Sequence, residues 1–246
     1  MSFRLATQWQ SRHLEETVRI VRWGHYGQPV LIFPTAGGDA EEIERFKLVE
    51  ALAPFLDGGR IKLYSCDNVA GRTWFSGGGS PRHCSRVQNL FDAFISDELL
   101  GAIRADCESP DIRPVVGGAS IGAFNALATL CRHPNDFRSA ICMSGTYDLE
   151  QHLQGEAINL DFFYSSPLHF LPQMEEGPQL ESLQDNFVIL AHGEGRWEEP
   201  EQSWRVAHVL GSRSIPNRVD SWGPDWHHDW PTWREMLPKY LEELLE

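Results

Sequence analysis

Three residues near the middle of the chain have the types and spacing that suit nucleophilic catalysis. Gly118, Ser120 and Gly122 form a Gly-x-Ser-x-Gly pattern within the stretch GGASIGAFNA. In a sharp turn from a strand into a helix, this pattern holds a serine at a strained backbone position, and the small flanking residues avoid clashes with neighbouring chain. The N-terminus of the following helix also favours developing negative charge. The pattern is common in ordinary turns, so its surroundings must decide its meaning.

The residues on either side of the pattern favour such a turn. RPVV (113–116) is a short apolar run that predicts a buried strand, and residues 121–133 combine small and apolar side chains as a helix packed on a sheet does. A serine nucleophile needs a base within hydrogen-bond reach and an acid that orients the base. In folds that place a serine nucleophile on such a strand-to-helix turn, the acid follows the serine along the chain and the histidine follows the acid.

Two adjacent histidines are candidates for the base. His227 and His228 lie in the segment SWGPDWHHDWPTWRE, which follows the last predicted strand. Asp229 and Pro231 are typical helix-start residues, so the histidines are expected on the loop that precedes the last helix. A loop in this place can bring an imidazole over the serine.

The acid is expected after the strand FVILAHG (187–193). The next residues, GEGRWEEP, offer Glu194, Glu198 and Glu199, and Asp148 is a more remote option after the preceding strand. In folds with such a strand-to-helix turn at the serine, the acid of the triad follows a strand at this point of the chain. A surface glutamate is more often a solvated loop charge, so the choice among these residues stays open on spacing alone.

Strands and helices alternate along the chain after an antiparallel start. This order predicts an α/β fold with a mostly parallel sheet of about eight strands and helices on both faces. The expected strands are residues 7–10, 16–24, 29–34, 61–67, 113–116, 139–145, 187–193 and 217–222. The longer expected helices are residues 43–52, 85–105, 121–133 and 231–246. Residues 1–246 are expected to form a single domain, with an irregular insertion at 147–186 near the site.

Composition excludes several classes of function. The formal net charge of −14 disfavours nucleic acid and anionic membrane surfaces as partners. The sequence shows no apolar run of the length that a leader or a membrane span needs, so a cytoplasmic protein is expected. The five cysteines lack metal-ligand or disulfide spacing, and the ten histidines form no metal motif. We therefore expect no metal and no cofactor; the sequence leaves the oligomeric state open.

Four segments in combination resemble one known family. They are FPTAGGDAEE, GGASIGAFNA, MSGTYDL and HDWPTWREMLP, and the resemblance extends from about Gln28 to Leu241. The chain is similar to the esterase-D-like esterases of the α/β-hydrolase superfamily, which also holds feruloyl esterases and mycolyltransferases. The resemblance implies the α/β-hydrolase fold and a serine carboxylesterase that forms an acyl-enzyme on Ser120. It implies a small, aromatic or carbohydrate-linked ester as substrate. An acyltransferase with the same intermediate and a non-catalytic binding protein are the alternatives.

The resemblance also implies roles for individual residues. The family's His-x-Trp pattern matches His228, Asp229 and Trp230, which favours His228 over His227 as the base. The family often has an aspartate as its acid, whereas this chain offers only glutamates at that point. Glu198 is favoured because its spacing from the preceding glycine resembles that of the members with a glutamate.

Donors for the oxyanion and an aromatic pocket complete the expected site. The backbone N–H of Ile121, next after the serine, is expected to be one donor of the oxyanion hole. The resemblance places the second at Ala36, in the loop after PVLIFP. Trp74 and Trp197 are expected on loops near the site, where they could contact substrate, and Trp197 is expected to help to exclude water from Glu198.

Overall fold

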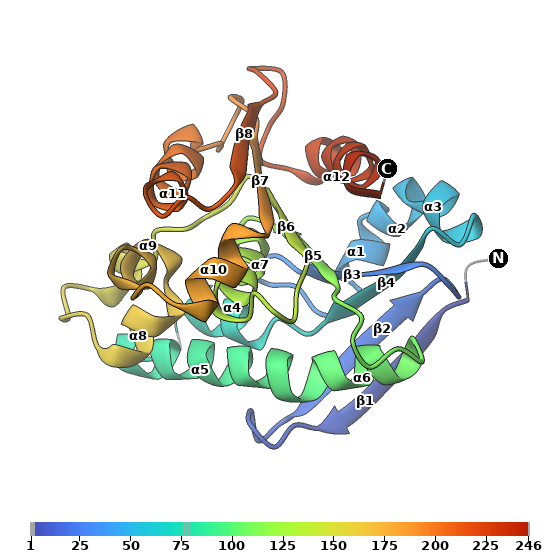
Figure 1. Cartoon of the computed structure of the whole chain (residues 1–246), viewed down its shortest axis with the longest axis horizontal. Coiled ribbons are helices and arrows are strands. Elements are labelled where there is room, and N and C mark those ends of the chain that lie inside the picture. Colours follow the sequence, from blue (N-terminus) through green and yellow to red (C-terminus); the bar gives the residue numbers. More distant parts are fainter. Residues whose placement is uncertain (1–2, 76, 78, 246) are drawn as a thin grey trace.

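A twisted eight-stranded sheet runs through the molecule (Figure 1). The computed structural model describes residues 3–75, 77 and 79–245. The strand order across the sheet is β1 (Leu5–Gln10), β2 (Thr17–Trp23), β4 (Ile61–Cys66), β3 (Gln28–Phe33), β5 (Val115–Ala119), β6 (Ser139–Met143), β7 (Phe187–His192) and β8 (Asn217–Ser221). From β4 to β8 all neighbours are parallel, while β2 is antiparallel to both β1 and β4. The expected antiparallel start and mostly parallel eight-stranded sheet are confirmed.

Apolar side chains of the central strands alternate between two cores. In β3, Leu31 and Phe33 pack into one core, while Val30 and Ile32 pack into the other. Because successive strand residues point to opposite faces, a continuous apolar run fills both faces of a sheet. Helices cover both faces accordingly (Figure 1). One face carries α5 (Pro81–Phe94), α6 (Leu100–Asp106), α7 (Ile121–Arg132) and α11 (Pro200–Ser212); the other carries α1 (Glu42–Arg45), α2 (Leu48–Ala51), α3 (Ala53–Asp57) and α12 (Trp230–Leu245).

Two predicted helices differ from the structure in their continuity. The single helix expected at 43–52 is two short helices, α1 and α2, and Lys47, with a positive φ of 62°, lies between them. The helix expected at 85–105 starts earlier, at Pro81, where Ser80 caps it by accepting a hydrogen bond from the His83 amide at 3.2 Å. A π-helical turn at Ile95–Leu99 separates α5 from α6. Apolar spacing predicts which face is buried, but not such breaks.

The region that was expected to be irregular consists of short helices. It contains α8 (Leu160–Ser165), α9 (Pro167–Phe170) and α10 (Pro178–Gln184), with 3-10 turns at Glu150–Leu153 and Leu171–Gln173. Its packing is anchored on α5, where Asn89 donates a hydrogen bond to Asp161 at 2.9 Å.

The carboxyl ends of the parallel strands lie at one edge of the sheet. The segments that follow β3, β5, β6, β7 and β8 therefore leave the sheet at the same edge, where open α/β sheets place their sites. All candidate residues of the triad and the oxyanion hole lie in these segments. Within the described residues, no helix has the length and the apolar character that crossing a membrane requires.

Candidate active site

Ser120 occupies the sharp turn between β5 and α7. Its φ of 57° and ψ of −125° are strained for a residue with a side chain. Gly118 and Gly122 are required by the closeness of the surrounding backbone. A Cβ on Gly118 would lie 2.4 Å from the carbonyl carbon of Gly122, and a Cβ on Gly122 would lie 2.4 Å from the carbonyl oxygen of Phe33. The turn thus has the geometry that the Gly-x-Ser-x-Gly pattern predicts.

Hydrogen bonds to the neighbouring strand end hold the serine in place. The Ser120 amide donates to the carbonyl oxygen of Met143 at 3.0 Å, and the Ser120 carbonyl accepts from the Thr146 amide at 3.1 Å. The Ser120 hydroxyl lies 3.5 Å from the Thr146 hydroxyl. Among the described residues, the Thr146 hydroxyl is the one hydrogen-bond partner of the Ser120 hydroxyl, which makes no hydrogen bond to a histidine. Ser120 as a whole is partly exposed.

Glu198 and His228 face each other beside this edge. Glu198 Oε2 lies 4.0 Å from His228 Nδ1, and the glutamate side chain is 1% exposed while the histidine is 23% exposed. This carboxylate oxygen is buried and, within the described part of the chain, has no hydrogen-bond donor. A buried carboxylate oxygen needs a partner, and a small rotation of the imidazole would supply Nδ1–H. Nε2 of the same ring is then left to accept a proton.

Ser144 supports the carboxylate from the other side. Its hydroxyl donates to Glu198 Oε1 at 2.6 Å and accepts from Trp233 Nε1 at 3.0 Å. Ser144 has a positive φ of 46°, directly after β6, which aims its side chain at the acid. The Trp233 ring also meets the His228 ring edge to face, with 5.3 Å between the centroids. We did not predict these two residues as parts of the site: the expected strand at 139–145 includes Ser144, whereas β6 ends at Met143.

The neighbouring histidine is held in a different way. His227 is exposed, and its Nδ1 accepts a hydrogen bond from the Arg196 amide at 3.0 Å. The His228 amide donates to the carbonyl oxygen of Arg196 at 3.1 Å. The two contacts bind the loop before α12 to the loop after β7, and they leave the ring of His228, rather than that of His227, opposite Glu198.

The other candidate carboxylates have partners elsewhere. Glu194 and Glu199 are exposed; the first accepts from the Ser221 hydroxyl at 2.6 Å and the second from the Gln202 side chain at 3.1 Å. Asp148 pairs with Arg205 at 2.7 Å. Of the four acids considered, Glu198 is the one that forms an ion pair with a histidine.

The loop after β3 presents Ala36 as expected. Within residues 3–75, 77 and 79–245, the Ala36 N–H donates no hydrogen bond. Ile121 is the first residue of α7, and a first helical residue has no acceptor for its N–H within the helix. Among the described residues, neither amide therefore has a hydrogen-bond acceptor in the protein, and Ile121 is buried. Unpaired donors of this kind are what an oxyanion hole requires.

The two tryptophans do not match their expected surroundings. Trp74 was expected on a loop, but it lies in α4 (Val69–Phe75), where it is 6% exposed and donates to Gln88 at 3.2 Å. Its apolar ring packs in the core against Phe162, so a loop placement was wrong. Trp197 is on a loop but 71% exposed, so it does little to exclude water from Glu198. Burial of that acid depends on other residues.

Comparisons with known proteins identify the family of the chain. The sequence model of the family described as "Esterase: Putative esterase" matches residues 73–244, well over half of the chain. The chain belongs to this esterase family. It is therefore a serine hydrolase of carboxylic esters, and the resemblance read from its four segments is confirmed. A search of curated proteins finds no match to the sequence.

Solved structures share the fold of this esterase over its whole length. A ferulic acid esterase is 12% identical with a TM-score of 0.74, covering 100% of this chain and 98% of its own. An S-formylglutathione hydrolase from Agrobacterium tumefaciens is 12% identical with a TM-score of 0.73, covering 100% and 96%. The enterobactin esterase FES from Shigella flexneri is 18% identical with a TM-score of 0.61, covering 98% and 59%. These likenesses establish the α/β-hydrolase fold.

Proposed function

We propose that this esterase hydrolyses a small-molecule ester through an acyl-enzyme on Ser120, with His228 as base and Glu198 as acid. The observation that carries the proposal is the buried Glu198 carboxylate, which faces His228 Nδ1 at 4.0 Å. A buried charge is costly unless it is paired, so this placement favours a carboxylate that works with the imidazole. The strained turn at Ser120, on the same edge of the sheet, supports the assignment of the nucleophile.

The reaction follows from the placement of these groups. The Ser120 oxygen attacks the ester carbonyl carbon while His228 Nε2 takes its proton, and Glu198 stabilises the imidazolium. The carbonyl electrons move to the oxygen, which the Ile121 and Ala36 N–H groups bind. When the tetrahedral intermediate collapses, the alcohol leaves with the proton from His228. Water then attacks the acyl-enzyme and gives its proton to His228. When this second tetrahedral intermediate collapses, His228 returns the proton to the Ser120 oxygen, the bond between that oxygen and the acyl carbon breaks, and the acid product departs.

Amide variants of the three glutamates test the triad. Glu198→Gln should lower kcat for a short p-nitrophenyl ester by about 10²- to 10⁴-fold, because a neutral amide cannot stabilise the imidazolium. The amide oxygen can still accept the Ser144 hydrogen bond, so the variant should remain folded. Glu194→Gln and Glu199→Gln are the matched controls, and each should stay within about threefold of wild type, as exposed side chains away from the reaction do. A dominant loss in either control would assign the acid to that residue instead.

The pH dependence of kcat/KM tests the base. Burial lowers the pKa of His228 below its ordinary value of 6.5, although the charge of Glu198 acts in the opposite direction. A lower pKa keeps the imidazole neutral, and hence able to accept a proton, at more acidic pH. We expect kcat/KM to be constant near neutrality and to fall only below a midpoint that is lower than 6.5.

The acid variant provides the matched comparison for this profile. Because the Glu198 charge raises the His228 pKa, Glu198→Gln should move the midpoint to still lower pH. A wild-type midpoint above the ordinary histidine value, or a shift upward in the variant, would contradict the pairing of these two residues.

A further inference from the structure

Asn68 lies beneath the loop that carries Ala36. It follows β4 at the sheet edge and is fully buried, with 0% of its surface exposed. Its side-chain amide donates to the carbonyl oxygen of Pro34 at 2.8 Å and to that of Thr35 at 3.3 Å. One side chain thus holds two consecutive carbonyl groups of the loop after β3.

The hydrogen bond to the Thr35 carbonyl also fixes the Ala36 amide. Thr35 C=O and Ala36 N–H belong to the same planar trans peptide unit, so they point in opposite directions. The Thr35 carbonyl also accepts from the Gly38 amide at 3.0 Å. Because the buried Asn68 binds the Thr35 carbonyl from the side of the core, the Ala36 N–H of the same peptide unit points away from the core.

Glu42 holds the same loop from the other end of Thr35. Its carboxylate accepts from the Thr35 amide and from the Thr35 hydroxyl, each at 2.7 Å, and the glutamate is 5% exposed. Burial raises the pKa of this carboxyl group, while the two hydrogen bonds from Thr35 lower it. Glu42 therefore holds the amide of Thr35, in the peptide unit with Pro34, and Asn68 holds its carbonyl, in the peptide unit with Ala36, so the planes on both sides of Thr35 have little freedom to rotate.

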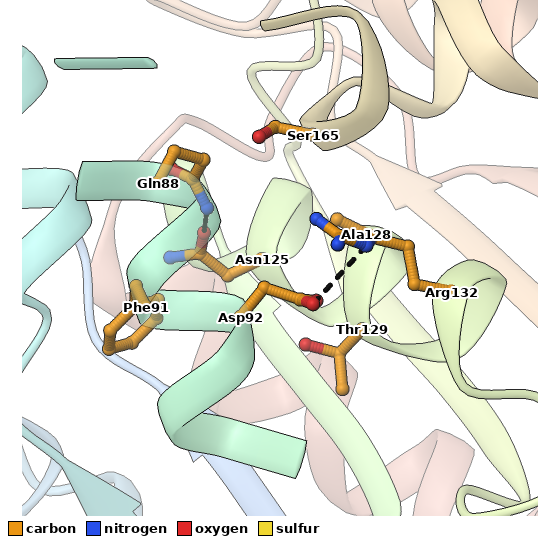
Figure 2. A pocket seen from close by; sticks show the side chains of 8 residues that line it. All are labelled: Gln88, Phe91, Asp92, Asn125, Ala128, Thr129, Arg132 and Ser165. Carbon is orange, nitrogen blue, oxygen red and sulfur yellow. Dashed lines mark hydrogen bonds and ion pairs between the residues drawn. The ribbon is translucent and has the colours of Figure 1, made fainter. Parts of the chain in front are cut away.

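The acceptor oxygen of Asn68 connects the loop to the helix of the nucleophile. It accepts from the Gly71 amide at 2.9 Å and from the Asn125 side chain at 3.1 Å. Asn125 is on α7, one turn beyond Ile121. The Asn125 side-chain oxygen in turn accepts a hydrogen bond from the Gln88 side-chain amide at 2.9 Å. Figure 2 shows this bond among the residues that line a small pocket. Asn68 uses both amide hydrogens and both acceptor positions, the full capacity of an asparagine side chain.

The start of α7 and the end of β3 are also in direct contact. A Cβ on Gly122 would lie 2.4 Å from the carbonyl oxygen of Phe33 and 2.8 Å from that of Pro34. The segments that carry Ile121 N–H and Ala36 N–H therefore pack without space between them. Asn68 adds hydrogen bonds to both segments, so it fixes how they sit against each other in addition to their direct contact.

We propose that Asn68 is a positioning residue, which sets the separation and direction of the Ala36 and Ile121 N–H groups. This role rests on the proposed function, in which the two amides bind the oxyanion. Its effect should fall on the transition state rather than on substrate binding, because the negative oxygen forms only as the ester is attacked. A misplacement of about 1 Å in such a site can cost on the order of 10²-fold in rate.

The test compares two buried asparagines. Asn186 is 2% exposed, donates to the carbonyl oxygen of Pro134 at 2.9 Å and precedes β7 at the opposite edge of the sheet. Asn68→Ala and Asn186→Ala both remove a buried amide that binds a proline carbonyl. Active sites are counted by complete labelling of Ser120 with a fluorophosphonate, so that unfolded protein is not included. For each variant, kcat and KM for a p-nitrophenyl ester and Ki for an aryl trifluoromethyl ketone are then measured. That ketone forms a hemiketal oxyanion on the serine.

Asn68→Ala should lower kcat about 10- to 100-fold per active site, leave KM within about threefold and raise Ki by the same factor as kcat/KM falls. Asn186→Ala should lower Tm but leave kcat and Ki within about threefold. If Asn68→Ala does not fold, Asn68→Ser replaces it, because its shorter side chain cannot reach both loop carbonyls. Labelled Asn68 variants with kcat and Ki within threefold of wild type would overturn the assignment of Asn68 alone. A wild type that is not labelled at Ser120 would overturn the proposed function and this role together.

Discussion

Replacing Ser120 with alanine is expected to lower kcat for a short p-nitrophenyl ester by about 10⁴-fold or more, the loss typical of a removed triad nucleophile. Alanine removes the only atom that can form the acyl bond at this turn, while Gly118 and Gly122 keep the backbone in place. The variant should also lose covalent labelling by a fluorophosphonate, which mass spectrometry of the peptide around residue 120 would detect. Activity near that of wild type would mean that the nucleophile lies elsewhere in the chain.

A glycine variant at the same position separates catalysis from strain. Alanine keeps a side chain at the positive φ of 57°, so the strain remains, whereas glycine adopts this conformation without cost. Strain of this kind costs on the order of 1–3 kcal/mol. Ser120→Gly should therefore be as inactive as Ser120→Ala but have a higher Tm in thermal unfolding. Equal Tm values for the two variants would show that the turn stores no strain that glycine relieves.

The second large effect is expected at His228. His228→Ala should lower kcat by about 10⁴-fold or more, because no other group described at this edge pairs with Glu198 and can take the serine proton. His227→Ala is the matched control, since it removes an imidazole from the adjacent position. It deletes the acceptor of the Arg196 amide at 3.0 Å, a contact on the exposed side of the loop.

We expect His227→Ala to retain kcat within about tenfold of wild type and to show a small decrease in Tm. Both variants should be compared at the same pH, above the expected midpoint, so that protonation of the base does not mask the difference. Similar losses in the two variants would contradict the assignment of His228, and a larger loss in His227→Ala would reverse it.

The serine and the overall fold are features that local sequence determines. A strained turn at Ser120 needs glycine at both flanking positions, and a continuous apolar run such as β3 needs a sheet covered on both faces. Both sequence patterns lie within a few positions of the chain, although Gly122 is needed because the distant Phe33 carbonyl lies against it. The order of strands and helices then limits the topology to a mostly parallel sheet.

The resemblance favours Glu198 and His228 as partners of the serine, and the tertiary structure adds the contacts that support them. Glu194, Glu198 and Glu199 are chemically equivalent in sequence, and only the fold buries Glu198 against Ser144 and opposite His228. The same reason explains the error at Trp74, because a tryptophan beside a glycine-rich stretch gives no local sign that its indole lies in the core.

The supporting residues of the site were the least accessible to prediction. Ser144 contacts Trp233, which is 89 positions away, and Asn68 contacts Pro34 and Asn125, at 34 and 57 positions. Spacing along the chain encodes turns and helix faces, since these form between near neighbours. It does not encode which distant segments meet, which depends on how the whole sheet assembles and which side chains fill the space between its helices. For this esterase, the sequence by itself determined the architecture and pointed to Ser120. Only the folded chain shows that Glu198 faces His228 and that Asn68 binds the loop of Ala36, because these contacts join distant segments.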